Sequence, residues 1–349
     1  MLERYAYLNT GTFGPLPRAT VEAMQAVERI ELGEGRSSRA YFERALDQRE
    51  ALRREFAGLL GTPPEQVALM TSTTEGCNIV LRGLGIGPGD EVVTTDSEHP
   101  GLFGGLVTSG AALRIVAIRD LEAGEILAAI QAEMTPRTRL LGLSHVSWLN
   151  GAVLPVRELA GHGVPVLVDG AQGAGAIPVD VEELGADFYT VSAQKWLLGP
   201  AATGALYVAR ERLEDCRVAF PSYFSWKLPD YELKDGAVRF EGSWTPPASV
   251  AGLLASLAFA AEAGDERFAR AREATERCRA LLLEHGADVV TEAGQGTLVS
   301  WREEDPEGVV ARLAEQGVIV RDLPGAGIVR ASCGYWTSEE DLERLVRGL

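Results

Sequence analysis

Two residues near the middle of the chain have the types and the placement needed for carbonyl chemistry. Lys195 follows Ser192-Ala193-Gln194, directly after the alternating apolar run 187–191. Upstream, the continuous apolar run 165–168 leads straight into Asp169. Such a run is typical of a strand that is buried on both faces, so a carboxylate is expected at the carboxyl end of that strand. The amine can form a Schiff base with an aldehyde, and the buried carboxylate needs a cation as its partner.

Pyridoxal phosphate would meet both requirements. Its aldehyde condenses with a lysine, and its protonated ring nitrogen pairs with a buried carboxylate. At about 4 Å and an effective dielectric constant of about 20, this charge pair is worth about 4 kcal/mol, enough to keep the nitrogen protonated. Taken alone, a Val-Asp-Gly is usually a turn or a helix cap and a Ser-x-x-Lys is usually a solvated loop. The combination of the two motifs points to the cofactor.

Further segments carry groups suited to such a cofactor. Thr71-Ser72-Thr73-Thr74 follows one predicted strand and opens a predicted helix, so its amides and hydroxyls either bind a phosphate or simply cap that helix. His99 follows another strand, where its ring either stacks on the cofactor or stays solvated. Gln172 lies one helical turn past Asp169 and is placed to reach the ring hydroxyl. Trp148 either packs in the core or forms a wall of the substrate pocket.

The periodicity of the chain predicts an α/β fold. Helical periods at 21–27 and 42–59 precede strands at 67–71, 91–96, 114–118, 139–146, 165–170, 187–193 and 204–209. Strands separated by helices form a mostly parallel sheet, and ligands bind beyond the carboxyl ends of its strands. After an aromatic stretch at 220–244, helices at 247–263 and 265–285, short strands at 288–291, 297–301, 318–322 and 328–332, and a helix from Ser338 predict a second α+β unit. We therefore expect an N-terminal arm (1–17), a large cofactor-binding domain (18–245) and a small C-terminal domain (246–349).

Composition excludes several classes of function. The net charge of -17 argues against binding to nucleic acid or to an anionic membrane, because no basic cluster is present to release counterions. The four cysteines and four histidines show no metal-ligand or disulfide spacing, so we expect no metal and a reducing cytoplasm. The most apolar stretch, 248–261, is too short to cross a membrane and is expected to be a buried helix.

At this point the motifs resemble a known family. VLVDGAQ, SAQKW, TSTTEGCN, DSEHPG and IVRASCGYWTSEEDLERLV look like the class V aminotransferase and cysteine desulfurase-like branch of the fold-type I pyridoxal phosphate enzymes, and they occur in the order of that family. DSEHPG, SHVSWLNGAVLP and RASCGYW are most similar to the cyst(e)ine carbon-sulfur lyases. The resemblance implies a large domain with a mostly parallel seven-stranded sheet, a smaller α+β C-terminal domain and a homodimer with a shared active site.

The resemblance also implies roles for individual residues. Lys195 would form the Schiff base, Asp169 would pair with the ring nitrogen, and His99 would stack on the ring. The other cofactor-binding residues would be Thr73, Thr74, Gln172, Ser192, Gln194 and, from the partner subunit, Thr245. Arg330 would bind the substrate carboxylate, with Arg321, Trp148, Asn9 and Thr12 lining the substrate pocket.

Departures from the family pattern bear on the reaction. Gln194 stands where many members have a histidine, and Ser243-Trp244 separate the Phe-Glu-Gly segment from Thr245. Desulfurases carry a nucleophilic cysteine just before the Arg330 position, whereas this chain has Asp322 to Gly327 there. We therefore expect a carbon-sulfur lyase that acts on cysteine-derived amino acids and releases pyruvate and ammonia. A class V aminotransferase, an isopenicillin N epimerase-like epimerase and a non-catalytic cofactor-binding protein are the alternatives.

Overall fold

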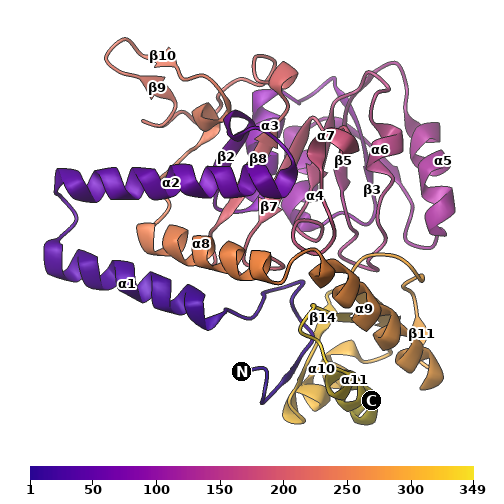
Figure 1. Ribbon diagram of the computed structural model, residues 1–349. Helices are drawn as coiled ribbons and strands as arrows, with labels where there is room; N and C mark the ends of the chain where they lie inside the picture. Colours follow the sequence, from indigo (N-terminus) through magenta and orange to yellow (C-terminus); the bar gives the residue numbers. More distant parts are fainter.

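A seven-stranded sheet forms the centre of the larger part of the molecule (Figure 1). The computed structural model describes residues 1–349. The strands of this sheet are β2 (Val67–Met70), β3 (Glu91–Thr95), β4 (Ala112–Val116), β5 (Thr138–Ser144), β6 (Val166–Asp169), β7 (Phe188–Ser192) and β8 (Gly204–Val208). Their order is β2-β8-β7-β6-β5-β3-β4. Only β8 runs against its neighbours, so β2 points the same way as the five parallel strands. The predicted fold class and all seven predicted strands are confirmed.

Helices cover both faces of this sheet. They are α2 (Arg39–Leu60), α3 (Thr73–Gly83), α4 (Pro100–Ser109), α5 (Ala123–Glu133), α6 (Val156–Leu159), α7 (Val181–Leu184) and α8 (Pro247–Glu262), with short 3-10 turns η1 (Pro64–Gln66), η2 (Arg210–Arg212) and η3 (Ala237–Phe240). Helix α1 (Arg18–Glu34) packs on α8. Helices α2, α5 and α8 share one apolar core with the sheet. Helices α3 and α4 pack on the opposite face. The two cores hold the strand ends in fixed positions.

The smaller part of the molecule is a four-stranded antiparallel sheet with three helices. Its strands are β11 (Asp288–Val289), β12 (Leu298–Arg302), β14 (Arg321–Leu323) and β15 (Ile328–Ser332), in the order β11-β12-β15-β14. The helices are α9 (Glu266–Glu284), α10 (Pro306–Glu315) and α11 (Glu339–Gly348). In the sequence, the segment between β8 and α8 contains a small antiparallel hairpin formed by β9 (Trp226–Lys227) and β10 (Glu232–Leu233).

Two features of the small domain differ from the sequence prediction. The expected strand 318–322 is split, because β13 (Val318–Ile319) pairs with one partner and β14 with another. The partner of β13 is β1 (Ala6–Tyr7), a parallel strand at the N-terminus that the sequence did not indicate. The N-terminal arm therefore begins in the small domain and crosses to the large one.

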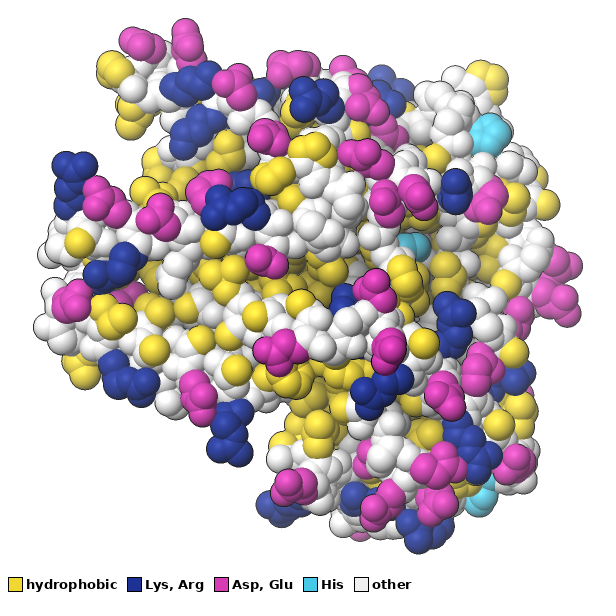
Figure 2. Space-filling view, in the orientation of Figure 1, with side chains coloured by type: hydrophobic (Ala, Val, Ile, Leu, Met, Phe, Trp, Pro, Cys, Tyr) yellow, Lys and Arg dark blue, Asp and Glu magenta, His cyan; other side chains and the backbone are white.

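The expected domain boundary at residues 245 and 246 stays a prediction. Helix α8, which follows it, is largely buried, and Val250, Leu253 and Leu257 belong to the core beside the large sheet. No helix alone has the length and apolar composition to span a membrane, and the one combination that does, α8 with α9, is bent by 81°. Figure 2 shows acidic and basic side chains intermingled over one face of the molecule, with apolar side chains gathered between and along α1, α2 and α8.

Candidate active site

The predicted site residues follow strands that all end at the same edge of the large sheet. Strand β2 leads to Thr73 and Thr74, β3 to His99, β5 to Trp148, β6 to Asp169, and β7 to Ser192 and Lys195. The antiparallel strand β8 brings none of them. Because parallel strands place their carboxyl ends together, residues far apart in the sequence converge in one region.

Asp169 carries a buried carboxylate with one unpartnered oxygen. The residue is 3% exposed, and its Oδ1 accepts a hydrogen bond of 3.0 Å from the Ala171 amide. Its Oδ2 is buried and has no hydrogen-bond partner. A buried acceptor without a partner is costly, so this oxygen is a place where a bound cation or N–H donor would be stabilised.

The Lys195 amine forms no hydrogen bond or salt bridge within the chain. The pKa of Lys195 is lowered to about 8, chiefly by burial; the charge of Asp169 opposes this shift, and the positive charges of Arg330 and Arg321 add to it. A lysine with a lowered pKa has a substantial fraction of neutral amine near neutral pH. That amine is the form that attacks a carbonyl group or accepts a proton.

The imidazole of His99 is held in one orientation by its own backbone. His99 is the N-cap of α4, and its Nδ1 accepts a hydrogen bond of 3.1 Å from the Gly101 amide. Burial and the charge of Lys195 lower the pKa of His99 to about 4, so the ring is neutral and its proton lies on Nε2. The ring meets Trp148 edge to face, with centroids 5.1 Å apart. The structure thus gives His99 a partly buried, flat and uncharged ring, and Trp148 borders the site.

A helix N-terminus supplies the donors for a phosphate. Thr73 and Thr74 form the first turn of α3, which Ser72 caps by accepting a hydrogen bond from the Glu75 amide. The first amides of a helix have no intrahelical acceptor, and they attract anions. Thr74 is exposed, whereas Thr73 is buried. At the end of β7, the Ser192 hydroxyl donates a hydrogen bond of 2.9 Å to Gln194 Oε1.

Two arginines of the small domain point to one threonine of the N-terminal arm. Arg330 is 1% exposed, and its Nη1 donates to the Trp148 carbonyl at 2.7 Å, while its Nε has no partner. Arg321 donates to Thr12 Oγ1 at 2.9 Å, and Arg330 Nη2 lies 3.4 Å from the same oxygen. Burial, and then the charge of Arg321, lower the pKa of Arg330 to about 9. Two guanidinium groups without a carboxylate partner make a site for an anion.

The N-terminal arm closes this side of the site. Thr12 Oγ1 donates to Asn9 Oδ1 at 2.7 Å, so Asn9 is linked through Thr12 to the two arginines. Gln172 Nε2 donates to the Gly11 carbonyl at 2.8 Å, and Gln172 Oε1 accepts from the Trp196 indole at 2.8 Å. One N–H of Gln172 remains for a ligand. At Gly14, a Cβ atom would lie 2.1 Å from the Lys195 carbonyl, so only glycine allows this approach.

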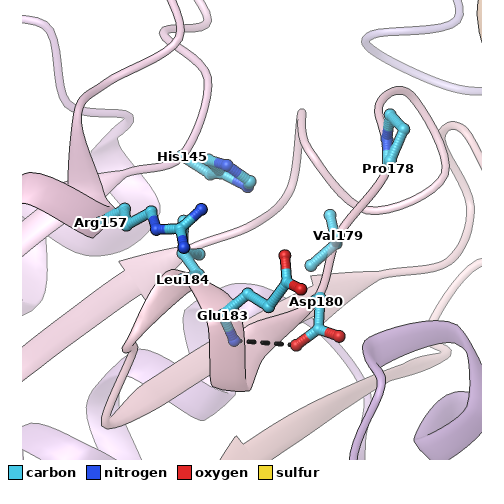
Figure 3. Close-up of a pocket in the computed structure, with 7 residues that line it drawn as sticks. All are labelled: His145, Arg157, Pro178, Val179, Asp180, Glu183 and Leu184. Carbon is cyan, nitrogen blue, oxygen red and sulfur yellow. Dashed lines mark hydrogen bonds between the residues drawn. The ribbon is translucent and has the colours of Figure 1, made fainter.

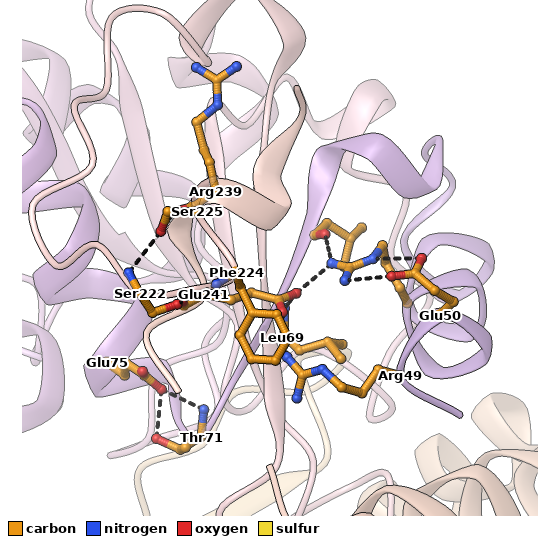
Figure 4. A network of polar contacts seen from close by, with 12 residues as sticks. Arg49, Glu50, Leu69, Thr71, Glu75, Ser222, Phe224, Ser225, Arg239 and Glu241 are labelled. Carbon is orange, nitrogen blue, oxygen red and sulfur yellow. Dashed lines mark hydrogen bonds and ion pairs between the residues drawn. The ribbon is translucent and has the colours of Figure 1, made fainter. Parts of the chain in front are cut away.

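Thr245 forms no hydrogen bond with the other predicted site residues. It is 5% exposed and lies just before α8. A buried ion-pair network anchors the segment that leads to it (Figure 4). Glu241 binds Arg49 and Arg53 and accepts a hydrogen bond from the Leu69 amide at 2.9 Å. The predicted contact of Thr245 with a partner subunit's phosphate stays a prediction.

Two polar residues of the region were missed from the sequence. Glu98 and Ser144 are buried and hydrogen-bonded to each other beside Asp169. A glutamate before His99 and a serine at the end of an apolar strand were the available signals, but both residue types are common at strand ends and in loops.

A separate cavity lies around His145 (Figure 3). Its volume is about 280 Å³, and none of the predicted site residues lines it. His145 contacts the Tyr189 hydroxyl at 2.9 Å, and burial lowers its pKa to about 4. This cavity is not part of the site at the strand ends.

The site residues fit pyridoxal phosphate on independent grounds. Asp169 offers an unpartnered buried oxygen for the ring nitrogen, and Lys195 offers an unbonded amine for the aldehyde. The N-terminus of α3 offers donors for the phosphate. Bound there, the cofactor would supply an electron-withdrawing ring for reactions at the α-carbon of an amino acid.

Several known proteins are similar to this chain in sequence and fold. Residues 6–345 match the family Aminotransferase class-V. An isopenicillin N epimerase of Streptomyces clavuligerus is 31% identical, and the alignment covers 98% of this chain and 93% of that protein. The structure of a cystine C-S lyase, C-DES, in complex with cysteine persulfide has a TM-score of 0.93 and 30% identity and covers 99% of this chain and 97% of that one.

A variant of that lyase carries glycine covalently linked to its pyridoxal phosphate cofactor. The cysteine desulfurase CsdA of Escherichia coli has a TM-score of 0.87 and 25% identity, covering 100% of this chain and 94% of that one. The fold, the geometry at the strand ends and the family match lead to one conclusion: the chain belongs to the class V aminotransferase family and is a pyridoxal phosphate-dependent enzyme of fold-type I.

Proposed function

We propose that this enzyme is a carbon-sulfur lyase that eliminates a sulfur leaving group from the β-carbon of a cysteine-derived amino acid. The products would be the released thiol or persulfide together with pyruvate and ammonia. The observation that carries this proposal is the short turn between β14 and β15, where Pro324 to Gly327 contain no cysteine. A desulfurase needs a thiol there to accept sulfur.

The four cysteines support the same proposal. All four are buried and none is in a disulfide. Burial raises the pKa of Cys216 to about 12 and raises the pKa of Cys77 well above its usual range. Cys278 and Cys333 lie in the core of the small domain. Because all four thiols are buried, no cysteine is placed to take up sulfur. Free thiols also favour the cytoplasm as the compartment of the protein.

The residues of the chain would divide the work as follows. Arg330, with Arg321 beside it, binds the α-carboxylate and so fixes the amino acid. Lys195 Nζ, whose pKa is lowered to about 8, takes the proton from the α-carbon in its neutral form. Asp169 would hold the ring nitrogen of a bound cofactor in its protonated form, and that cofactor would supply an electron-withdrawing ring for the reaction at the α-carbon. His99, being neutral, covers the ring without adding a charge, and Trp148 walls off the side chain of the substrate.

An epimerase-like or aminotransferase activity is the second candidate. The isopenicillin N epimerase of S. clavuligerus matches nearly the whole chain. Proton removal at the α-carbon opens lyase, epimerase and aminotransferase reactions alike, so the groups around Lys195 serve all three. The activities diverge only after that step.

A substrate panel separates these reactions. Cystine, cysteine, cysteine sulfoxides and alanine are incubated with the enzyme, and pyruvate, keto acids and exchange of the α-proton for deuterium are measured. The lyase releases pyruvate from a sulfur-containing substrate. Loss of chirality without pyruvate would identify an epimerase, and conversion of the cofactor to its amine form with keto-acid release would identify an aminotransferase.

As a second check, replacing all four cysteines by serine or alanine is expected to leave turnover by the folded fraction intact. A single cysteine replacement that abolished turnover would identify a desulfurase.

We further infer that the enzyme is a homodimer. Apolar side chains are exposed along α1 and α2, among them Leu32, 89% exposed, and Phe42, 48% exposed. Contiguous exposed apolar surface is typical of a protein interface. In such a dimer, Thr245 is the residue that we expect to contact the phosphate of the partner subunit.

A further inference from the structure

Glu98 is a buried carboxyl group that the mechanism above does not use. It is 8% exposed and sits in the loop between β3 and α4. Its Oε1 accepts a hydrogen bond of 2.8 Å from Thr95, the last residue of β3. Its Oε2 accepts one of 2.6 Å from Ser144, the last residue of β5. Glu98 thus ties the loop that carries His99 to a neighbouring strand.

The charges around Glu98 are negative. Ser144 pairs directly with Asp169 across β5 and β6, and the charge of Asp169 acts on Glu98. From α3, the buried Cys77 thiol has its pKa raised first by burial and then by the charges of Asp169 and Glu98. The two hydrogen-bonding groups are hydroxyls, and the adjacent imidazole of His99 is neutral. No lysine or arginine is bonded to Glu98.

Two neighbouring buried carboxyl groups do not ionise together at low cost, so one of them keeps a proton. Asp169 has to be ionised to pair with the protonated ring nitrogen. Burial raises the pKa of Glu98 to about 7, the Ser144 and Thr95 hydrogen bonds oppose this, and the charge of Asp169 adds to it. A protonated Glu98 also keeps both contacts, because Ser144 Oγ has no other hydrogen-bond partner and can accept the proton.

We propose that Glu98 is a positioning residue that, as an uncharged carboxylic acid, fastens the His99 loop to β5 and leaves Asp169 as the single anion available to the ring nitrogen of a bound cofactor. This inference rests on the cofactor and not on the choice between lyase, epimerase and aminotransferase. Its tests therefore use the protein without substrate, and their outcome is independent of the proposed reaction.

The first test is infrared spectroscopy of the cofactor-free protein across a pH series. At about pH 6, wild type should show the C=O band of a buried carboxylic acid, and Glu98→Gln should lack it. In Asp169→Asn the band should titrate away at a lower pH than in wild type, because the neighbouring negative charge is gone. A band that survives Glu98→Gln, its absence from wild type, or a midpoint unchanged in Asp169→Asn would overturn the proposal.

The second test compares cofactor affinity in three variants by absorbance titration. Glu98→Gln imitates the protonated acid, so its Kd should stay within about 2-fold of wild type. Glu98→Ala and Ser144→Ala break the tie, and each should weaken binding by about 10-fold, the effect of losing one or two hydrogen bonds. If Glu98→Gln weakens binding as much as Glu98→Ala, an ionised carboxylate is required and the proposal is wrong. Ser144→Ala keeps the comparison valid if Glu98→Ala folds poorly.

The third test is the pH dependence of thermal unfolding. Because the pKa of Glu98 is raised from 4.5 to about 7 on folding, its contribution to stability is present in full below about pH 4.5 and is lost as the pH rises through about 7. The Tm difference between Glu98→Gln and wild type should therefore shift in favour of the variant over this range. A difference that does not change with pH would contradict an uncharged Glu98.

Discussion

Arg330 is the residue on which recognition of an amino acid depends. Its guanidinium is buried, keeps one N–H without a partner and lies beside a second arginine with no carboxylate nearby. From the sequence alone it could equally have been a surface charge, and burial excludes that alternative. A bidentate contact with a carboxylate matches its planar fork, which lysine does not reproduce.

We therefore expect Arg330→Lys to keep the fold and the bound cofactor but to lower kcat/KM by about 100-fold, or about 2.7 kcal/mol of transition-state binding. Steady-state kinetics with the best amino-acid substrate give this ratio, and amines without a carboxyl group serve as the control because they should be almost unaffected. Turnover within a few-fold of wild type would transfer the carboxylate-binding role to Arg321.

Lys195 gives the site a pH dependence that can be measured before any substrate is added. Covalent attachment of the cofactor needs the neutral amine. Since the pKa of Lys195 is lowered from 10.5 to about 8, the rate of attachment to cofactor-free protein should rise with pH and level off above about pH 8. An ordinary lysine would keep gaining up to its own higher pKa.

Borohydride reduction followed by peptide mapping identifies the attached lysine. The chain has only three lysines, and Lys227 and Lys234 lie at or next to the β9-β10 hairpin, so they are an internal control. Lys195→Ala should incorporate no reduced cofactor. Attachment to Lys227 or Lys234, or a rate that rises steadily past about pH 9.5, would contradict the assignment of Lys195.

At the scale of elements, the segment from β8 to α8 depends on one buried acid. Glu241 is fully buried between Arg49, which also stacks on Phe224, and Arg53, and it connects this segment to α2 and β2. Removing a single partner from a buried ion pair leaves uncompensated charge in the interior, which costs far more than losing an exposed pair.

Glu241→Gln is accordingly expected to lower the free energy of unfolding by about 3–5 kcal/mol in urea denaturation. Glu43→Gln is the matched control. The Arg39–Glu43 pair lies on α2, the helix that also carries Arg49 and Arg53, but it is exposed and should contribute less than about 1 kcal/mol. Equal losses in the two variants would show that the buried network does not hold the segment.

The elements themselves were largely predictable from the sequence. The strands of the large sheet have apolar runs such as Val166 to Val168 that turn signals bound on both sides, and burial on both faces makes such runs distinct. Short pairings were not predictable. Strand β1 has two residues, and the partner that stabilises it lies at the other end of the sequence. Periodicity within a segment contains no information about such a partner.

In the site too, residues marked by a local sequence pattern were predictable, whereas residues defined by contacts between distant segments were not. Lys195, Asp169 and His99 could be identified because strand ends and motif order place them, and the structure does bring them together with Arg330 and Arg321. Glu98 could not, since its importance comes from burial beside Asp169 and not from its neighbours in the sequence. The Gln172 side-chain amide donates a hydrogen bond to Gly11 and accepts one from Trp196, and no local sequence pattern reveals these two contacts.

At the scale of the whole molecule, a dimer with shared sites predicts complementation. In a mixed dimer of Lys195→Ala and Thr245→Ala chains, one site has both defects and the other has none. Equal amounts of the two variants, refolded together, should regain about a quarter of the wild-type activity for a two-fold symmetric pair. Sedimentation verifies the dimer, and each variant alone is the control. A mixture no more active than the average of the two variants would place Thr245 outside the partner's site.

The N-terminal arm has a consequence for the order in which the protein is made and folded. Ala6 and Tyr7 pair with β13, and the Leu8 carbonyl accepts a hydrogen bond from the Ser332 amide. During synthesis these first residues leave the ribosome long before their partners exist. The large sheet can form in the meantime, but the arm, and with it the wall that Asn9 and Thr12 give the pocket, waits until nearly the last residues have been translated. A nascent chain can therefore possess the lysine and its neighbouring aspartate while it still lacks the means to select an amino acid.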